Sequence, residues 1–176
     1  MSKLVLRPLE PSDGEKLYRW LNDDEINNNA LFRDSLPISA FSLKQKLESG
    51  YYCNENRKYF MVVVETTDIG LITLTEIDYT KRTAKCDFLI AEHDFRNQGY
   101  AVGAVKKICS YFFDVLSFRK LYLGAYEYNR PSIVLQAWAG ARYEGTLRQS
   151  FYRFGKYWDK VLFAIDEDLW RKYKAS

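Results

Sequence analysis

Short apolar runs alternate with polar turns through the middle of this chain. Leu4–Arg7 alternates between apolar and polar residues and stops at Pro8, which predicts a short first strand. Three β-branched and aromatic runs, Tyr59–Glu65, Ile69–Ile77 and Thr83–Ala91, are separated by short polar turns. This pattern predicts three successive antiparallel strands in one sheet.

The N-terminal third instead has helical spacing. A capping box of Ser12 and Glu15 predicts the start of a first helix. A second helix is expected to begin at Ser39 or Ser42. The polar, Asn-rich stretch between them, together with Ala-Leu-Phe at its end (22–32), predicts irregular chain.

The second half of the chain alternates helical and strand patterns. Asn129 is expected to cap a helix that ends at Gly140, and a Phe-Gly turn joins two long strands. The predicted elements are a helix over 100–116, a strand over 121–125, the helix after Asn129, a hairpin of 142–153 and 156–165, and a short helix over 167–173. Strands and interposed helices predict an α+β or mixed α/β sheet fold.

Length and composition favour one domain over residues 1–176. The chain has 176 residues, 47% of them hydrophobic, and a formal net charge of +3. Because the basic residues are spread along the sequence, nucleic acid is not an expected partner. Cys86 and Cys109 fall within predicted core elements, and Cys53 completes an odd number without metal-ligand spacing, so we expect reduced thiols and a cytoplasmic protein. No apolar run reaches membrane-spanning length, so no membrane partner is expected.

One six-residue stretch carries the clearest chemical signal. It lies between the strand 84–91 and the helix that begins at position 100, and it contains a glycine. The first N–H groups of a helix have no intrahelical partner and stand at the positive end of its dipole, so they can hold a pyrophosphate. The residues of this expected phosphate cradle are Arg96, Asn97, Gln98, Gly99, Tyr100 and Ala101.

With the strand 120–124 and the segment Asn-Arg-Pro-Ser (129–132) after it, this stretch resembles the acetyl-coenzyme A signature of the GCN5-related N-acetyltransferases (GNAT family). Within that family the chain looks most like the branch of ribosomal-protein alanine and serine acetyltransferases. The resemblance extends from Leu6 to Asp159. It implies a central twisted, mostly antiparallel sheet of about seven strands, flanked by helices, with one splayed pair of central strands.

The resemblance also implies acetyl-CoA as co-substrate, without a metal. It assigns the pyrophosphate to the amides of residues 96–101, and the pantetheine arm and acetyl oxygen to backbone groups of the strand before them. Those strand positions are Leu89, Ile90 and Ala91. Asn129 and Ser132 would contact the lower pantetheine or the adenine side.

Acetyl transfer to an amine requires a base for the ammonium and stabilisation of the departing thiolate. Glu76 and Asp87 are the candidate bases, although each could instead pair with a nearby lysine or face solvent. The position where the family often has a tyrosine acid is Gln136, which cannot donate a proton usefully. Ser132, Tyr128 or solvent are the possible replacements.

These residues favour an acetyl-CoA-dependent N-acetyltransferase that transfers directly to a primary amine in a ternary complex. The acceptor could be a protein N-terminus or an amino sugar or other small amine; a polyamine ranks lower, because Asp23–Glu25 is the only compact acidic cluster. A non-catalytic coenzyme A-binding module is the alternative. The modest net charge disfavours a third function, nucleic-acid binding by the C-terminal hairpin. A homodimer is possible, because exposed sheet edges often pair.

Overall fold

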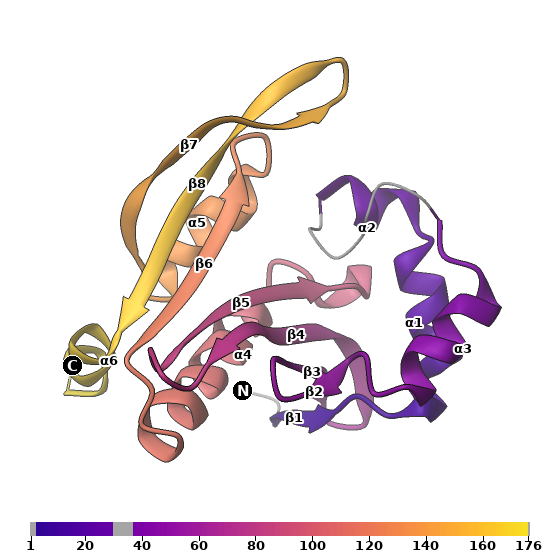
Figure 1. Cartoon of the computed structure of the whole chain (residues 1–176), viewed down its shortest axis with the longest axis horizontal. Helices are drawn as coiled ribbons and strands as arrows, with labels where there is room; N and C mark the ends of the chain where they lie inside the picture. Colours follow the sequence, from indigo (N-terminus) through magenta and orange to yellow (C-terminus); the bar gives the residue numbers. More distant parts are fainter. Residues whose placement is uncertain (1–2, 30–36, 176) are drawn as a thin grey trace. The chain divides into compact units, whose positions relative to one another are not determined.

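The computed structural model describes residues 3–29 and 37–175, which form a sheet with helices. The strands hydrogen-bond in the order β1-β3-β4-β5-β6-β8-β7, and β2 pairs with β3 (Figure 1). Their bounds are β1 (Leu4–Pro8), β2 (Cys53–Asn54), β3 (Arg57–Val64), β4 (Thr67–Asp78), β5 (Thr83–Ile90), β6 (Lys120–Tyr126), β7 (Arg142–Arg153) and β8 (Lys156–Asp166). The mixed α/β architecture and the mostly antiparallel sheet agree with the sequence prediction.

Six α-helices and three short helical segments accompany the strands within the described residues. The α-helices are α1 (Gly14–Leu21), α2 (Asp24–Asn29), α3 (Ala40–Glu48), α4 (Tyr100–Cys109), α5 (Arg130–Trp138) and α6 (Glu167–Ala175). The short segments are η1 (Pro11–Asp13), η2 (His93–Phe95) and η3 (Ser110–Val115), the last with π-helical hydrogen bonds. None of the described helices combines the length and the apolar content needed to span a bilayer.

The described chain divides into two compact units. The first contains Met1–Thr75 and Asp87–Tyr100, and the second contains Glu76–Cys86 and Ala101–Ser176. The chain passes from one unit to the other within β4, within β5 and again at the start of α4, between Tyr100 and Ala101. That residues 1–176 form a single domain stays a prediction.

In the first unit, helices cover an antiparallel ladder. β1 pairs with β3 over five positions, and β3 pairs with β4 with a bulge at Val62/Val63. The core between these strands and α1 and α3 contains Leu17, Trp20, Leu43 and Met61, each at most 2% exposed. Spacing of three and four residues places Leu17, Trp20 and Leu21 on one face of α1, as an amphipathic helix requires.

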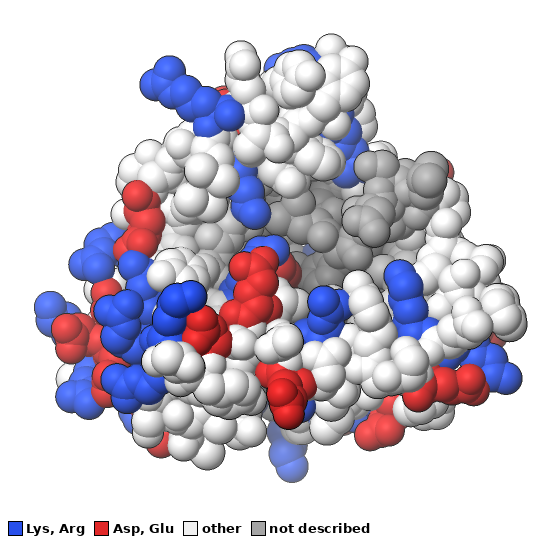
Figure 2. Space-filling view, viewed as in Figure 1, with Lys and Arg blue, Asp and Glu red and all other residues white. Residues whose placement is uncertain are grey.

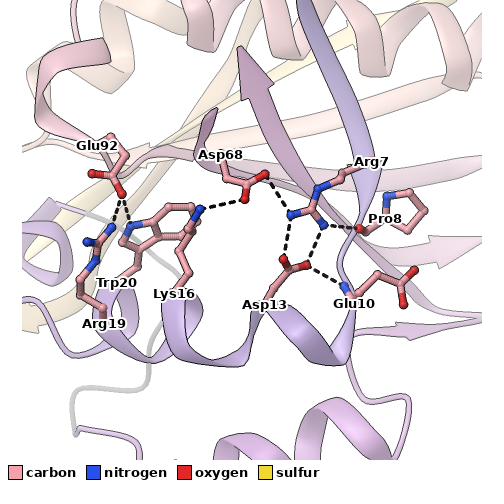
Figure 3. Close-up of polar contacts among 9 residues, drawn as sticks. All are labelled: Arg7, Pro8, Glu10, Asp13, Lys16, Arg19, Trp20, Asp68 and Glu92. Atoms are coloured by element: carbon pink, nitrogen blue, oxygen red, sulfur yellow. Dashed lines mark hydrogen bonds and ion pairs between the residues drawn. The ribbon is translucent and has the colours of Figure 1, made fainter. Parts of the chain in front are cut away.

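A charge network fastens β1 to the start of α1 (Figure 3). The guanidinium of Arg7 donates to both carboxylate oxygens of Asp13, at 2.8 and 2.7 Å, and to Asp68 at 2.9 Å. Lys16 donates to the other oxygen of Asp68 at 2.8 Å. Asp13 also accepts from the Glu10 amide at 2.9 Å, so Glu10 and Asp13 form the capping box of η1, directly before α1, in place of the expected box of Ser12 and Glu15.

In the second unit, β6, β8 and β7 run side by side in an antiparallel arrangement, and α5 lies against β6 (Figure 1). β5 pairs in parallel with β6 from Thr83 to Lys85. The buried face of α4 contains Ala104, Val105 and Ile108, which follow helical spacing.

Most predicted elements are present within one to three residues of their expected bounds. The sheet has eight strands rather than about seven, because the two-residue β2 pairs with β3 at Cys53–Lys58 and Asn54–Arg57. So short a strand has no alternation by which the sequence could reveal it. α2 occupies Asp24–Asn29 within the stretch expected to be irregular, while the Ala-Leu-Phe at 30–32 lies outside the described residues.

Candidate active site

The expected phosphate cradle forms a turn between η2 and α4. Two residues have left-handed backbone, Asn97 with φ 60° and Gly99 with φ 82°. A Cβ atom added to Gly99 would meet no other atom within 4 Å, so the space above this glycine is open. Within the described part of the chain, the amides of Asn97, Gln98 and Gly99 donate to no other protein group. Together with the first turn of α4, they form a row of available N–H donors at the positive end of a ten-residue helix.

Arg96, the first residue of the cradle, has a different role from the residues after it. Its amide donates to the carbonyl of His93 at 3.0 Å, so it is not among the available donors. Its guanidinium donates to the carbonyl oxygens of Ile90 at 3.2 Å and Ala91 at 2.9 Å, and also to the carboxylate of Glu25. The side chain therefore connects the cradle to the end of β5, and the amides that could receive a diphosphate are those of residues 97–101.

At the end of the strand before the cradle, some backbone groups already form hydrogen bonds within the protein. The Ala91 amide donates to the Ile69 carbonyl at 2.8 Å, and the Ala91 carbonyl accepts from Arg96. Gly70 of β4 lies so close that an added Cβ would be 2.0 Å from the carbonyl oxygen of Leu89. Both backbone groups of Ala91 and the carbonyl of Ile90 are thus occupied within the protein, so Leu89 and the amide of Ile90 are the stronger candidates for contact with a pantetheine arm.

The two candidate bases differ in their surroundings. Glu76 is exposed and has φ 51° within β4, a left-handed conformation that interrupts the regular strand at this residue. Asp87 is half-buried in β5, close enough to Tyr59 for its negative charge to matter. Burial, the neighbouring Tyr51 and this charge raise the pKa of Tyr59 to about 12, opposed by Arg57, so the phenol is neutral at physiological pH.

The start of α5 contains the remaining predicted site residues. Asn129 caps the helix, because its side-chain oxygen accepts from the Ser132 amide at 3.1 Å. The Ser132 hydroxyl, half-buried in the first turn, accepts from the side-chain amide of Gln136 at 3.3 Å. Asn129, Ser132 and Glu76 belong to the second unit, whereas Asp87, Leu89–Ala91 and Arg96–Tyr100 belong to the first, as one continuous stretch.

The hairpin of β7 and β8 contributes an aromatic cluster to the second unit. Tyr126 stacks on Phe151 with ring centroids 4.3 Å apart, and Tyr128 meets Trp158 edge-on at 5.1 Å. Lys156 lies over the Trp158 ring at 3.7 Å. Basic side chains of this end of the hairpin are Arg148, Arg153, Lys156 and Lys160. Figure 2 shows Lys and Arg among uncharged side chains where Figure 1 places this hairpin.

Sequence reasoning missed three features of the site. It gave Arg96 only a backbone role and did not foresee that Asp87 lies close enough to Tyr59 to help raise the pKa of its phenol. It also took Gln136 only as a missing acid, although the side chain is fully buried and bonded to Ser132. The spacing of four residues between Ser132 and Gln136 on a helix was the available signal. Across the described residues, no group of three His, Cys, Asp or Glu side chains is placed to hold a metal ion.

Comparison with known proteins identifies the family and the fold. The family model of the acetyltransferase (GNAT) domain matches residues 3–142. The chain therefore belongs to the GNAT acetyltransferase family, whose members use acetyl-CoA as co-substrate. It is an acetyl-CoA-dependent N-acetyltransferase.

Several relatives cover nearly the whole chain. The spermidine N(1)-acetyltransferase of Vibrio cholerae serotype O1 is 29% identical to this chain over 161 residues, which are 90% of each protein. The spermidine N(1)-acetyltransferase of Escherichia coli K12 is 28% identical over 163 residues, which are 91% of this chain and 84% of the relative. A solved structure of the V. cholerae spermidine N-acetyltransferase in complex with CoA and spermine has a TM-score of 0.87 and 25% identity, covering 96% of this chain and 98% of the other.

The predicted branch of ribosomal-protein acetyltransferases is not confirmed. A putative ribosomal N-acetyltransferase of Bacillus subtilis is 24% identical over 176 residues, covering 97% of this chain and 95% of that protein, a lower identity than the spermidine enzymes have. The part of the resemblance that the comparison supports is the family itself.

Proposed function

We propose that this enzyme acetylates a primary amine of the polyamine class by direct transfer from acetyl-CoA in a ternary complex. The observation that carries the acceptor class is the similarity to spermidine N-acetyltransferases over about nine tenths of both chains. This proposal reverses the lower rank that the sparse acidic clusters of the sequence gave to polyamines.

The coenzyme is proposed to bind through the cradle. The available amides of Asn97, Gln98 and Gly99 and the first turn of α4 would hold the diphosphate, because they combine unpaired donors with the positive end of a helix dipole. Leu89 and Ile90 would contact the pantetheine arm, Asn129 would contact its lower part or the adenine side, and Ser132 would lie at the thiol end of the arm. The open space beside Gly99 supports this placement.

For the chemistry, Glu76 or Asp87 would take a proton from the substrate ammonium so that the neutral amine can attack, and the hydroxyl of Ser132 would donate a hydrogen bond to the leaving thiolate. The left-handed backbone at Glu76 supports this residue, since strained strand positions often aim a side chain for function. Direct transfer, without a covalent enzyme intermediate, is supported by Cys86 and Cys109, whereas the third cysteine, Cys53, is exposed. Cys86 and Cys109 are buried, and burial raises the pKa of Cys109 to about 12, which leaves this thiol un-ionised and unsuited to attack.

A second acceptor class is favoured by the hairpin. Its aromatic cluster is flanked by the four basic side chains of residues 148–160, and Lys156 already covers the Trp158 ring. Such a surface suits an anionic amine, for example an amino sugar attached to a nucleotide, better than a polycation.

Three further expectations belong to this proposal. One domain is expected to span residues 1–176, the protein is expected to act in the cytoplasm, and copies of the chain are expected to associate. A V. cholerae spermidine N-acetyltransferase structure with a TM-score of 0.79 and 26% identity, covering 94% of each chain, is described as dodecameric. Association through a sheet edge such as β7 would begin with the homodimer expected from sequence.

The test is thiol release from acetyl-CoA with a panel of acceptors. The panel contains spermidine, spermine, an N-terminal peptide and a nucleotide-linked amino sugar. Spermidine or spermine should give the highest kcat/KM. Preference for the amino-sugar nucleotide would replace the polyamine proposal with the second one, and preference for the peptide would overturn both.

A further inference from the structure

Gln136 is a fully buried polar residue with an unsatisfied atom. The side chain is 0% exposed and lies on the inner side of α5. Its Nε2 donates to the Ser132 hydroxyl oxygen at 3.3 Å. Its Oε1 is the one buried side-chain oxygen or nitrogen without a hydrogen-bond partner among the described residues. The whole amide group thus has a single polar contact, with Ser132.

A contribution to folding stability does not explain why a glutamine occupies this buried position. A buried carbonyl oxygen without a partner costs about 1–3 kcal/mol, more than a single neutral hydrogen bond usually returns. An apolar side chain of similar volume would avoid that cost. The residue therefore has a feature that a purely structural role does not require.

The contact with Ser132 has a defined chemical consequence. A serine hydroxyl has one proton to donate and lone pairs that accept. Because the Gln136 N–H occupies a lone pair, the Ser132 proton is directed away from Gln136. Without that donor, the hydroxyl could rotate and bond to nearby backbone, as serines on helices commonly do.

The first turn of α5 has few other donors. Pro131 has no N–H, and the Ser132 amide is already bonded to the Asn129 side chain. The Ser132 hydroxyl and the Arg130 amide are the donors left at this helix start. An anion placed here would be stabilised by the helix dipole and by the hydroxyl proton together.

We propose that Gln136 is a positioning residue that holds the Ser132 hydroxyl as a donor to the departing thiolate of coenzyme A. In the step, the C–N bond to the amine forms, the C–S bond breaks, and the electron pair stays on sulfur. The proton on nitrogen passes to the base, and Ser132 keeps its proton while hydrogen-bonding to sulfur. The inference rests on the proposed acetyl transfer, and it gives a role to a residue that replaces the usual acid.

A double-mutant cycle of Gln136→Met and Ser132→Ala tests this role. Ser132→Ala should lower kcat roughly tenfold, less than the loss of an oxyanion donor, because a thiolate is a tolerable leaving group unaided. Gln136→Met should lower kcat about fivefold, leave the KM for acetyl-CoA unchanged, and leave the melting temperature equal or higher. In the double variant, kcat should match that of Ser132→Ala within about twofold.

The possible outcomes distinguish failure of the positioning role of Gln136 from failure of the proposed acetyl transfer. If Gln136→Met keeps the full kcat, or if the double variant loses about fiftyfold as independent effects would require, the positioning role is overturned. Gln136→Leu serves as a second apolar variant should the methionine variant fail to fold. Unmodified protein that releases no thiol with any amine of the panel overturns the acetyl-transfer proposal and this inference with it.

Discussion

Arg96 Nη2 donates to the carbonyl oxygen of Ala91 at 2.9 Å, which joins the cradle to the end of β5. The same guanidinium bonds Ile90 at 3.2 Å, and only about a quarter of its side chain is exposed. Arginine suits this position, because its planar fork can satisfy several carbonyl oxygens at once. The basic residue beside the proposed diphosphate site therefore holds the loop in place, and the site depends on main-chain donors.

Replacing Arg96 with Met should raise the Kd for acetyl-CoA about tenfold. Hydrogen bonds from a charged donor contribute roughly 1.5–3 kcal/mol, and about 1.4 kcal/mol corresponds to one factor of ten. Calorimetric titration at several salt concentrations is the measurement. The salt dependence should equal that of the unmodified protein, because the charge does not face the ligand.

Arg130→Met is the matched control for this change. Arg130 is 73% exposed and lies 3.6 Å from Glu127, so its loss should leave the affinity within about twofold. A reduced salt dependence in Arg96→Met would show that the guanidinium contacts the phosphates after all, contrary to the hydrogen bonds of the structure.

Gly99→Val should abolish tight coenzyme binding with only a modest loss of stability. Left-handed backbone costs an L-residue about 1–2 kcal/mol, and the new side chain would occupy the open space where the diphosphate is proposed to lie. Gly140→Val is the matched control, because Gly140 has φ 85° and equally open surroundings but lies after α5. Equal affinity of the two variants would remove the cradle from the site.

Sequence periodicity located the helices and strands, because the buried face of each element requires apolar residues at regular spacing. The apolar face of α1, the Asn129 cap of α5 and the hairpin of β7 and β8 follow directly from local residue patterns. The capping box at the start of this helical region is formed by Glu10 and Asp13 and not by the predicted Ser12 and Glu15, and the carboxylate of Asp13 is also held by Arg7 of β1. No local pattern encodes that contact.

In the site, too, local residue patterns were visible in the sequence, whereas contacts between distant residues were not. The glycine turn was visible in the sequence because left-handed backbone restricts residue type. Other features of the site depend on neighbours far along the chain or on helix packing. They are the hydrogen bonds of the Arg96 amide and guanidinium, the closeness of Asp87 to Tyr59, and the burial of Gln136. Residue type indicated where chemistry could occur, but the availability of each group required the fold.

The two candidate bases can be separated by their amide variants. If Glu76 is the base, Glu76→Gln should lower kcat by two to three orders of magnitude and remove the limb of the pH–rate profile that falls toward acid. Asp87→Asn should then alter kcat only a few-fold. The reverse result would assign the base to Asp87, and near-normal turnover in both variants would exclude both carboxylates. Coenzyme affinity should stay unchanged in each, since neither residue is in the cradle.

Asp13 should make the protein sensitive to acid. Burial raises the pKa of this carboxyl, but the Arg7 hydrogen bonds, the Glu10 amide and the charges of Arg7 and Lys16 outweigh it, so the pKa lies below its usual value of 3.8. A carboxyl with a depressed pKa in the folded state stabilises the protein above its unfolded pKa, and that contribution is lost as the pH falls through the folded value. Urea denaturation should therefore show stability falling below about pH 4.

Asp13→Asn should remove this contribution and flatten the acid dependence. At neutral pH we expect a loss on the order of 2–3 kcal/mol, between the values typical of exposed and fully buried ion pairs, because the carboxylate is 9% exposed and its partner Arg7 is 35% exposed. Asp68→Asn is the control: it weakens the contacts of Asp68 with Arg7 and Lys16, but Arg7 keeps its paired bonds to Asp13, so the variant should cost less. An equal loss in both variants would mean that the network acts as a whole, without a special role for the Asp13 carboxylate.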